Sequence, residues 1–147
     1  MYAAKIYEKI KNYTIDKEKA LKFAKNFDFN KHSNALRSFL GKGAEAMISL
    51  EEKEGKYDLT KHSERLDIII KNWDKIKDIV TGEIPSVSEL ENLYKKIDMP
   101  ICLKEIGIDE SILKDTFVAS KDIRDKYVLS RLCWDLGITD EILEDLL

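Results

Sequence analysis

The sequence predicts an all-α protein, and three observations support this class. Apolar residues recur at three- and four-residue spacings along nearly the whole chain, as on the buried face of an amphipathic helix. No stretch alternates apolar and polar residues between turns, which would be typical of a strand. Only two prolines and six glycines interrupt the 147 residues. Because we find no internal repeat, we expect a compact bundle of about eight helices rather than a solenoid.

The first expected helix runs from Met1 to about Asn12, with Ile6 and Ile10 on one face. No Ser, Thr, Asp or Asn precedes it to cap its N-terminus. We therefore expect Met1–Lys11 to be the remaining turns of a longer helix, from a chain that began further upstream.

The second and third helices have clearer boundaries. Asp16 can cap a helix over Lys17–Phe27, and Asn30 opens the next one. The inward residues expected on that third helix are Ala35, Leu36, Phe39 and Leu40. Gly41 and Gly43 follow with the spacing of a phosphate-binding loop, but no strand precedes them and no third glycine completes the pattern. We expect a loop or helix break here rather than a nucleotide site.

The C-terminal half also divides at caps and helix breakers. Thr60 can cap a long helix to about Val80, which Gly82 would end. Ser86 and Glu89 fit a capping box at the start of the next helix. The later boundaries are predicted from residues of the same kind: Pro100, Asp109, Gly137 and Thr139.

Composition and charge narrow the functional classes. The 25 basic and 28 acidic residues give a net charge of −3, which argues against a nucleic-acid binder. No apolar run is long enough to predict a membrane span, and charges interrupt the N-terminal segment where a signal peptide would be apolar. Cys102 and Cys133 are expected to be two buried thiols in a cytoplasmic protein.

Residue spacing predicts no active site within this chain. His32 and His62 lack a partner at ligand spacing, so both are expected at the surface or at a helix start. No serine lies in a G-x-S-x-G elbow, and no cysteine has a catalytic signature. We therefore assign no catalytic, cofactor-binding or metal-ligating residue.

Residues 120–138, SKDIRDKYVLSRLCWDLGI, predict one amphipathic helix. Its apolar face would carry Leu129, Leu132, Cys133 and Leu136, extended by Ile123. The pairs Asp122–Lys126 and Arg131–Asp135 are four residues apart, and each would stabilise this helix by about 0.2–0.5 kcal/mol.

A second face of this helix is the only candidate binding surface. Arg124, Tyr127 and Arg131 lie at i, i+3 and i+7, so a helix would place them side by side. Two guanidinium groups and a phenol can bind a phosphate. The alternative, which we favour, is a set of salt bridges to another helix or to a partner domain.

Three phrases along the chain carry a family resemblance: EGKYDLTKHSERLDIIIKNWDKIKDIV, IPSVSELENLYKKIDMPICLKEIGID and SKDIRDKYVLSRLCWDLGI. In this order they resemble the C-terminal helical half of the sn-glycerol-1-phosphate dehydrogenases, most closely the bacterial branch associated with arabinose operons. The likeness extends from Tyr2 onward. Its most specific pieces are Lys56–Asp58, Asn72–Trp73, Pro85, Glu105–Gly107 and Ile123–Tyr127.

The resemblance implies a two-domain enzyme of the iron-containing alcohol dehydrogenase-like superfamily, with a dehydroquinate synthase-like helical domain. Such enzymes use NADH or NADPH and a divalent metal (nickel, zinc or iron) to reduce dihydroxyacetone phosphate to sn-glycerol 1-phosphate. It also implies that all three metal ligands, an aspartate and two histidines, lie before Met1, so neither His32 nor His62 is a ligand. Val128 departs from the family pattern, which usually has threonine there.

Residues 1–147 are therefore expected to form one all-α domain, the C-terminal half of a longer oxidoreductase. Alone it would be inactive, because the nucleotide domain and the metal ligands are missing. Its expected partners are an N-terminal dinucleotide-binding domain, in the same or a separate chain, and a second copy of itself. The Met1 end should expose an apolar patch where the neighbouring domain packs. The alternative is a stand-alone helical interaction or dimerisation module without catalysis; an unrelated helical regulator is disfavoured by the acidic balance.

Overall fold

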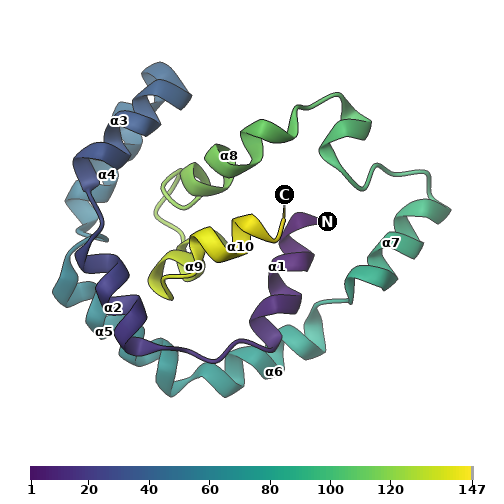
Figure 1. The fold of residues 1–147 in the computed structure, drawn as a ribbon, viewed down its shortest axis with the longest axis horizontal. Helices are drawn as coiled ribbons and strands as arrows, with labels where there is room; N and C mark the ends of the chain where they lie inside the picture. The colour runs from purple at the N-terminus through teal and green to yellow at the C-terminus, as the bar shows by residue number, and fades with distance from the viewer. Residues whose placement is uncertain (147) are drawn as a thin grey trace.

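The computed structural model describes residues 1–146, and all of its regular structure is helical (Figure 1). This confirms the all-α class. The α-helices are α1 (Tyr2–Lys11), α2 (Lys17–Lys25), α3 (Phe29–Leu40), α4 (Ala44–Glu54), α5 (Leu59–Lys71), α6 (Trp73–Glu83), α7 (Val87–Lys96), α8 (Leu113–Ser120), α9 (Leu129–Asp135) and α10 (Thr139–Glu144). Three short 3-10 turns join them: η1 (Gly41–Gly43), η2 (Leu103–Ile106) and η3 (Glu110–Ile112). No helix in the described part of the chain is both long enough and apolar enough to cross a membrane.

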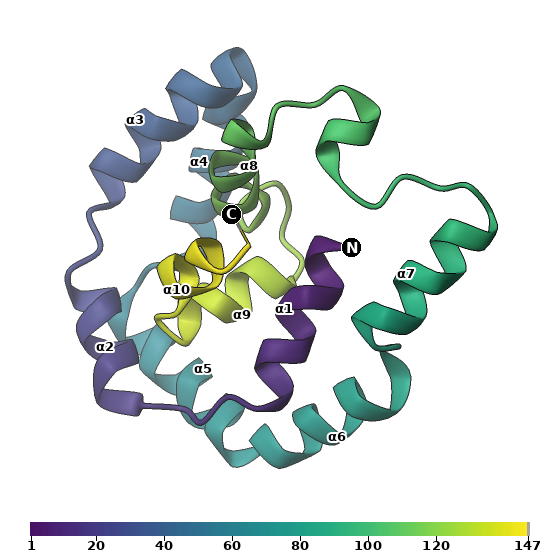
Figure 2. The same ribbon diagram turned by 45° about the vertical axis from the view of Figure 1, so that its right-hand side comes forward.

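The helices pack around two apolar cores. α9 and α10 lie near the centre, with α1, α2, α5 and α6 around them (Figures 1 and 2). The main core joins these six helices through Ile6, Ile10, Ala20, Leu66, Ile69, Trp73, Leu132, Cys133, Leu136, Ile138 and Ile142. A smaller core joins α3, α4 and α8 through Leu36, Ala44, Met47, Ile48 and Ala119. The two cores meet at α9 and the segment before it, where the candidate site lies.

Several predicted boundaries are confirmed. Asp16 caps α2 by accepting a hydrogen bond from the backbone N–H of Lys19. Ser86 and Glu89 form both hydrogen bonds of the capping box at α7. The Gly41–Gly43 segment is a 3-10 turn between two helices, as expected for a helix break.

The single long helix expected from Thr60 is two helices. Asn72 ends α5 and precedes the first residue of α6, so the chain changes direction there. The cap of α5 is Asp58, whose side chain accepts a hydrogen bond from the backbone N–H of Lys61. At the other end, Gly82 lies within α6 instead of ending it. Local signals thus identified this stretch as helical, but they missed the break at Asn72 and misplaced the ends by a few residues.

The helix expected over residues 120–138 is shorter than predicted. Only Leu129–Asp135 is α-helical, while residues 121–128 form turns and bends. Lys121 and Asp122 turn into the protein interior, whereas Ile123, expected on the apolar face, is exposed. Burial of two charged side chains overrides the apolar periodicity, because they reach partners on other helices.

A nine-residue pattern, D-x-x-K-H-S-x-x-L, occurs at residues 28–36 and again at 58–66. This recurrence was not predicted from the sequence. In both copies the aspartate accepts a hydrogen bond from the backbone N–H of the lysine at 2.9 Å and so caps the helix. His32 and His62 consequently occupy the same position, the fourth residue of α3 and of α5. The two leucines that close the pattern are both buried.

Candidate functional site

Five ionisable side chains are buried together where α3 and α4 meet α9 and the segment before it. They are His32, Glu51, Lys121, Asp122 and Arg131, and we call them the buried charged cluster. Placing unpaired charges in a protein interior costs several kcal/mol per ion, so such groups are expected to be paired. Each member does contact at least one other member, and the lysine, the arginine and both carboxylates form ion pairs.

Asp122 is the centre of the cluster. Its Oδ1 accepts hydrogen bonds from Arg131 Nη2 at 2.6 Å and from the Tyr57 hydroxyl at 2.7 Å. Its Oδ2 lies 2.8 Å from Lys121 Nζ and 2.6 Å from His32 Nε2. Burial by itself would raise the pKa of Asp122, but the hydrogen bond with His32 and the charges of Lys121 and Arg131 hold it well below its usual range. The carboxylate is therefore ionised at neutral pH.

Arg131 links Asp122 to a second carboxylate. The same Nη2 donates to Glu51 Oε2 at 2.6 Å, and Lys56 Nζ donates to Glu51 Oε1 at 2.8 Å. Burial raises the pKa of Glu51, and the hydrogen bond from Lys56 and the charge of Arg131 oppose this. The guanidinium lies 4.7 Å from the ring centroid of Tyr57 and 5.5 Å from that of Trp134. The rings attract the positive charge of the guanidinium, whose buried Nε and Nη1 have no hydrogen-bond partner among residues 1–146.

The tautomer of His32 follows from this network. Because Asp122 is ionised and its Oδ2 can only accept, we assign a proton to Nε2, which donates to Oδ2. Lys121 Nζ lies 3.0 Å from the same nitrogen and donates instead to Asp122 and to the carbonyl of Val118. Burial lowers the pKa of Lys121 to about 8, against the attraction of Asp122. In the neutral form of the ring, the other nitrogen, Nδ1, is a hydrogen-bond acceptor.

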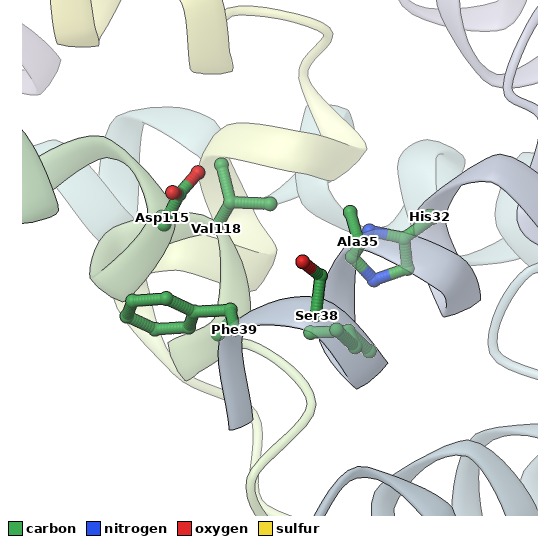
Figure 3. A pocket seen from close by; sticks show the side chains of 8 residues that line it. His32, Ala35, Ser38, Phe39, Asp115 and Val118 are labelled. Carbon is green, nitrogen blue, oxygen red and sulfur yellow. The ribbon is translucent and has the colours of Figure 1, made fainter. Parts of the chain in front are cut away.

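His32 also lines an open pocket of about 380 Å³ between α3 and α8, the α3–α8 pocket (Figure 3). α3 supplies one wall and α8 the other, and the lining residues are His32, Ala35, Leu36, Ser38, Phe39, Asp115, Val118 and Ala119. Ala35 and Phe39, expected to face inward, are exposed here. The pocket combines apolar walls with an imidazole, a hydroxyl and a carboxylate. It can accept hydrogen bonds from a small ligand, but within residues 1–146 no hydrogen bond links Ser38 to His32 as in a nucleophile–base pair.

The three residues of the predicted phosphate-binding face are not side by side. Arg131 is buried and only 2% exposed. Arg124 is exposed on the segment before α9, at the edge of a separate pocket of about 410 Å³ near Tyr2. Tyr127 is exposed as a residue, but its hydroxyl donates to the buried Asp135 Oδ2 at 2.8 Å. The prediction of a shared helix face is wrong because residues 124 and 127 are not in a helix.

The expected intrahelical pair Arg131–Asp135 is also wrong. Asp135 instead accepts a hydrogen bond from Arg65 Nη2 at 3.0 Å. Asp122 pairs with Arg131 and Lys121 rather than with Lys126. In both cases a buried carboxylate takes a partner from another part of the chain.

Both histidines begin helices as expected, but neither is at the surface. His62 is completely buried, and its Nε2 donates to the backbone oxygen of Asp135 at 2.9 Å. Its ring packs edge-on against Trp134, and within the described residues its Nδ1 has no hydrogen-bond partner. The repeated D-x-x-K-H-S pattern is the sequence signal that could have predicted the same helical position for both histidines. Of the two cysteines, Cys133 is buried as expected, and Cys102 is half-buried.

The chain's own donors do not fit the divalent metal that the resemblance attributes to the intact enzyme. No group of three or more His, Cys, Asp or Glu side chains among residues 1–146 is arranged to hold a metal ion. His32 and His62 both direct Nε2 to an aspartate, through a carboxylate in one case and a backbone oxygen in the other.

Comparisons with known proteins found no relative: no family model matches the chain, and neither curated proteins nor solved structures match it. Its function must be inferred from the residues and contacts described above.

Proposed function

We propose that this chain is the all-α domain of a glycerol-1-phosphate dehydrogenase-like oxidoreductase. Its role would be to form one wall of the active-site cleft. An N-terminal dinucleotide-binding domain would supply the nucleotide site and the metal ligands. The complete enzyme would then reduce dihydroxyacetone phosphate to sn-glycerol 1-phosphate with NAD(P)H. The chain alone would not transfer hydride.

The observation that carries this proposal is that two of the segments with the most specific resemblance contact each other. Lys56–Asp58 and Ile123–Tyr127 are far apart in the sequence. Lys56 Nζ nevertheless donates to the backbone oxygen of Arg124 at 3.4 Å. Tyr57 donates to Asp122, the residue just before the second segment, at 2.7 Å. Residues that share one structural task are expected to lie together in this way.

That task would be to hold residues 121–128 in one conformation. Lys121 and Asp122 anchor the start of this loop in the buried charged cluster, and Tyr127 anchors its end on Asp135. Between the anchors, Arg124 is exposed and free to contact an anion or a partner domain. Arg131 would be a positioning residue: it is buried, and it holds Asp122 in place by a hydrogen bond without contacting a ligand itself.

A longer homologue that carries both domains tests this role. Replacing the residue equivalent to Arg124 with alanine should raise the KM for dihydroxyacetone phosphate by about tenfold or more, since a charge-assisted hydrogen bond contributes about 1.5–3 kcal/mol. The matched control replaces the homologue's residue equivalent to Arg37 with alanine. In this chain Arg37 is another exposed arginine, on α3. Equal kinetics for the two variants would contradict the role of Arg124. Rapid NADH or NADPH oxidation by the 147-residue chain with nickel, zinc or iron would contradict the proposal as a whole.

The second candidate function, a stand-alone interaction module, is favoured by one feature. α7 has no buried residue, although its apolar side chains lie on one side of the helix. An apolar helix face that stays partly exposed is typical of a surface that binds a partner.

A further inference from the structure

We propose that α7 is an interface at which two copies of this chain associate, with their α7 helices antiparallel. This inference does not depend on the proposed enzymatic role. It rests on the exposure of α7, on the arrangement of its apolar residues and on the position of its charges.

α7 lies at the rim of the molecule in both views (Figures 1 and 2). Val87, Leu90 and Tyr94 are half-buried, whereas Leu93 and Ile97, just after the helix, are 51% and 54% exposed. An isolated exposed leucine needs no explanation, but two large neighbours on one side of a helix leave a continuous apolar strip.

The chain beyond α7 also exposes apolar residues. The segment that follows exposes four further large apolar residues: Met99, Ile106, Ile108 and Ile112. One helix of ten residues would bury little area on its own, and stable interfaces bury about 1,200–2,000 Å² in total. The neighbouring segment supplies the additional apolar area that a dimer needs.

The apolar residues of α7 have the spacing of a helix–helix seam. Leu90, Leu93 and Ile97 are separated by three and four residues, as the a and d positions of a heptad are. Glu89 and Lys96 both lie one residue before an apolar a position, so they flank the seam on the same side. Glu89 is near the start of the helix and Lys96 is at its end.

These two charges determine the occupant and its direction. When two such helices pack antiparallel, the same flanks meet, and Glu89 of each copy faces Lys96 of the other. A parallel pair would instead bring both residues against the other flank of the partner's seam, where α7 carries Val87 and Tyr94 and no charge. The surface is therefore complementary to itself about a two-fold axis, as an isologous dimer interface requires.

Sedimentation velocity of the 147-residue chain over a wide concentration range tests the proposal. The weight-average mass should rise from the 17.0 kDa of the monomer toward twice that value as concentration increases. Leu93→Asp should abolish this rise by placing a charge in the seam. Far-UV circular dichroism should remain unchanged, because Leu93 is exposed.

A pair of charge reversals in the last turn of α7 provides the matched control. Lys96→Glu should weaken dimerisation roughly tenfold, because it places two like charges on the same flank of the seam. Lys95→Glu makes the same change on the outward side of the helix and should leave dimerisation unchanged. Adding Glu89→Gln to Lys96→Glu should restore much of the association, because the repulsion is removed and glutamine can still complete the capping box.

A strictly monomeric chain at the highest concentration would overturn the proposal. So would equal weakening by Lys95→Glu and Lys96→Glu. Because mass is measured rather than enzymatic activity, these outcomes are independent of the test of the dehydrogenase role.

Discussion

The helices α3 and α5 begin with the same nine-residue pattern, yet their histidines lie in different surroundings. His32 donates to an ionised side-chain carboxylate and lines an open pocket. His62 donates to a backbone oxygen and is sealed against Trp134 with its Nδ1 unpaired. The two regions thus share a local sequence and a helix start, and differ in everything contributed by distant residues.

This difference shows which properties a short sequence determines. The aspartate cap and the position of the histidine in the first turn depend on neighbouring residues only, so both copies have them. The chemistry of each imidazole depends on what packs against it. For His32 the partner is Asp122, and for His62 it is Asp135, and in each case a long stretch of chain separates the pair.

The largest expected effect comes from removing the carboxylate on the His32 side. Asp122→Asn should lower the free energy of unfolding by about 3–5 kcal/mol, because Lys121 and Arg131 would keep buried charges without this counterion. Asp135→Asn should cost less, because Arg65 is partly exposed and His62 contacts the backbone oxygen. Urea denaturation of both variants measures the difference. If the two costs are equal, the two regions do not differ as described.

The pH dependence of stability should differ between the regions because only the His32 side contains a buried lysine. The pKa of Lys121 is lowered to about 8 in the folded protein, whereas an unfolded lysine titrates near about 10.4. Between these values the unfolded chain binds more protons, so stability should increase with pH in that window, by about 3 kcal/mol in total.

Lys121→Met should remove this contribution. The measurement is the difference in unfolding free energy between the variant and the original chain, followed from pH 8 to about pH 10. Taking a difference cancels the titration of other groups. If the difference does not change with pH, the pKa of Lys121 is not lowered in the folded protein.

Replacing each histidine with phenylalanine compares the two imidazoles directly. His32→Phe should cost about 2 kcal/mol, because it removes a hydrogen bond to a charged carboxylate. His62→Phe should cost about 1 kcal/mol, because the lost hydrogen bond is to a neutral oxygen and the unpaired Nδ1 is removed with it. Thermal or urea unfolding gives both values, and the reverse order would contradict the tautomer assigned to His32.

The sequence was sufficient for the all-α class and for caps such as Asp16 and the Ser86–Glu89 box, because these depend on residues a few positions apart. It was insufficient for the candidate site. Arg131 has the spacing of a surface phosphate ligand, but its partner Glu51 lies on α4, 80 residues away. Apolar periodicity also continued through Lys121 and Asp122, and only their partners on other helices explain why the chain leaves the helix there.

The smallest effect should be the one that the two regions share. Asp28→Ala and Asp58→Ala each remove a cap that accepts a hydrogen bond at 2.9 Å, and each should cost about 1 kcal/mol. Replacement by serine should restore most of the loss in both, since serine is nearly as good a cap. Urea unfolding should therefore give matching values for the two alanine variants, although the histidine four residues further on is open to a pocket in one region and sealed in the other. If the two losses in unfolding free energy clearly differ, tertiary packing around the helix start also changes the energy of the cap. The two helix starts would then be alike in sequence but not in the stability that their caps contribute.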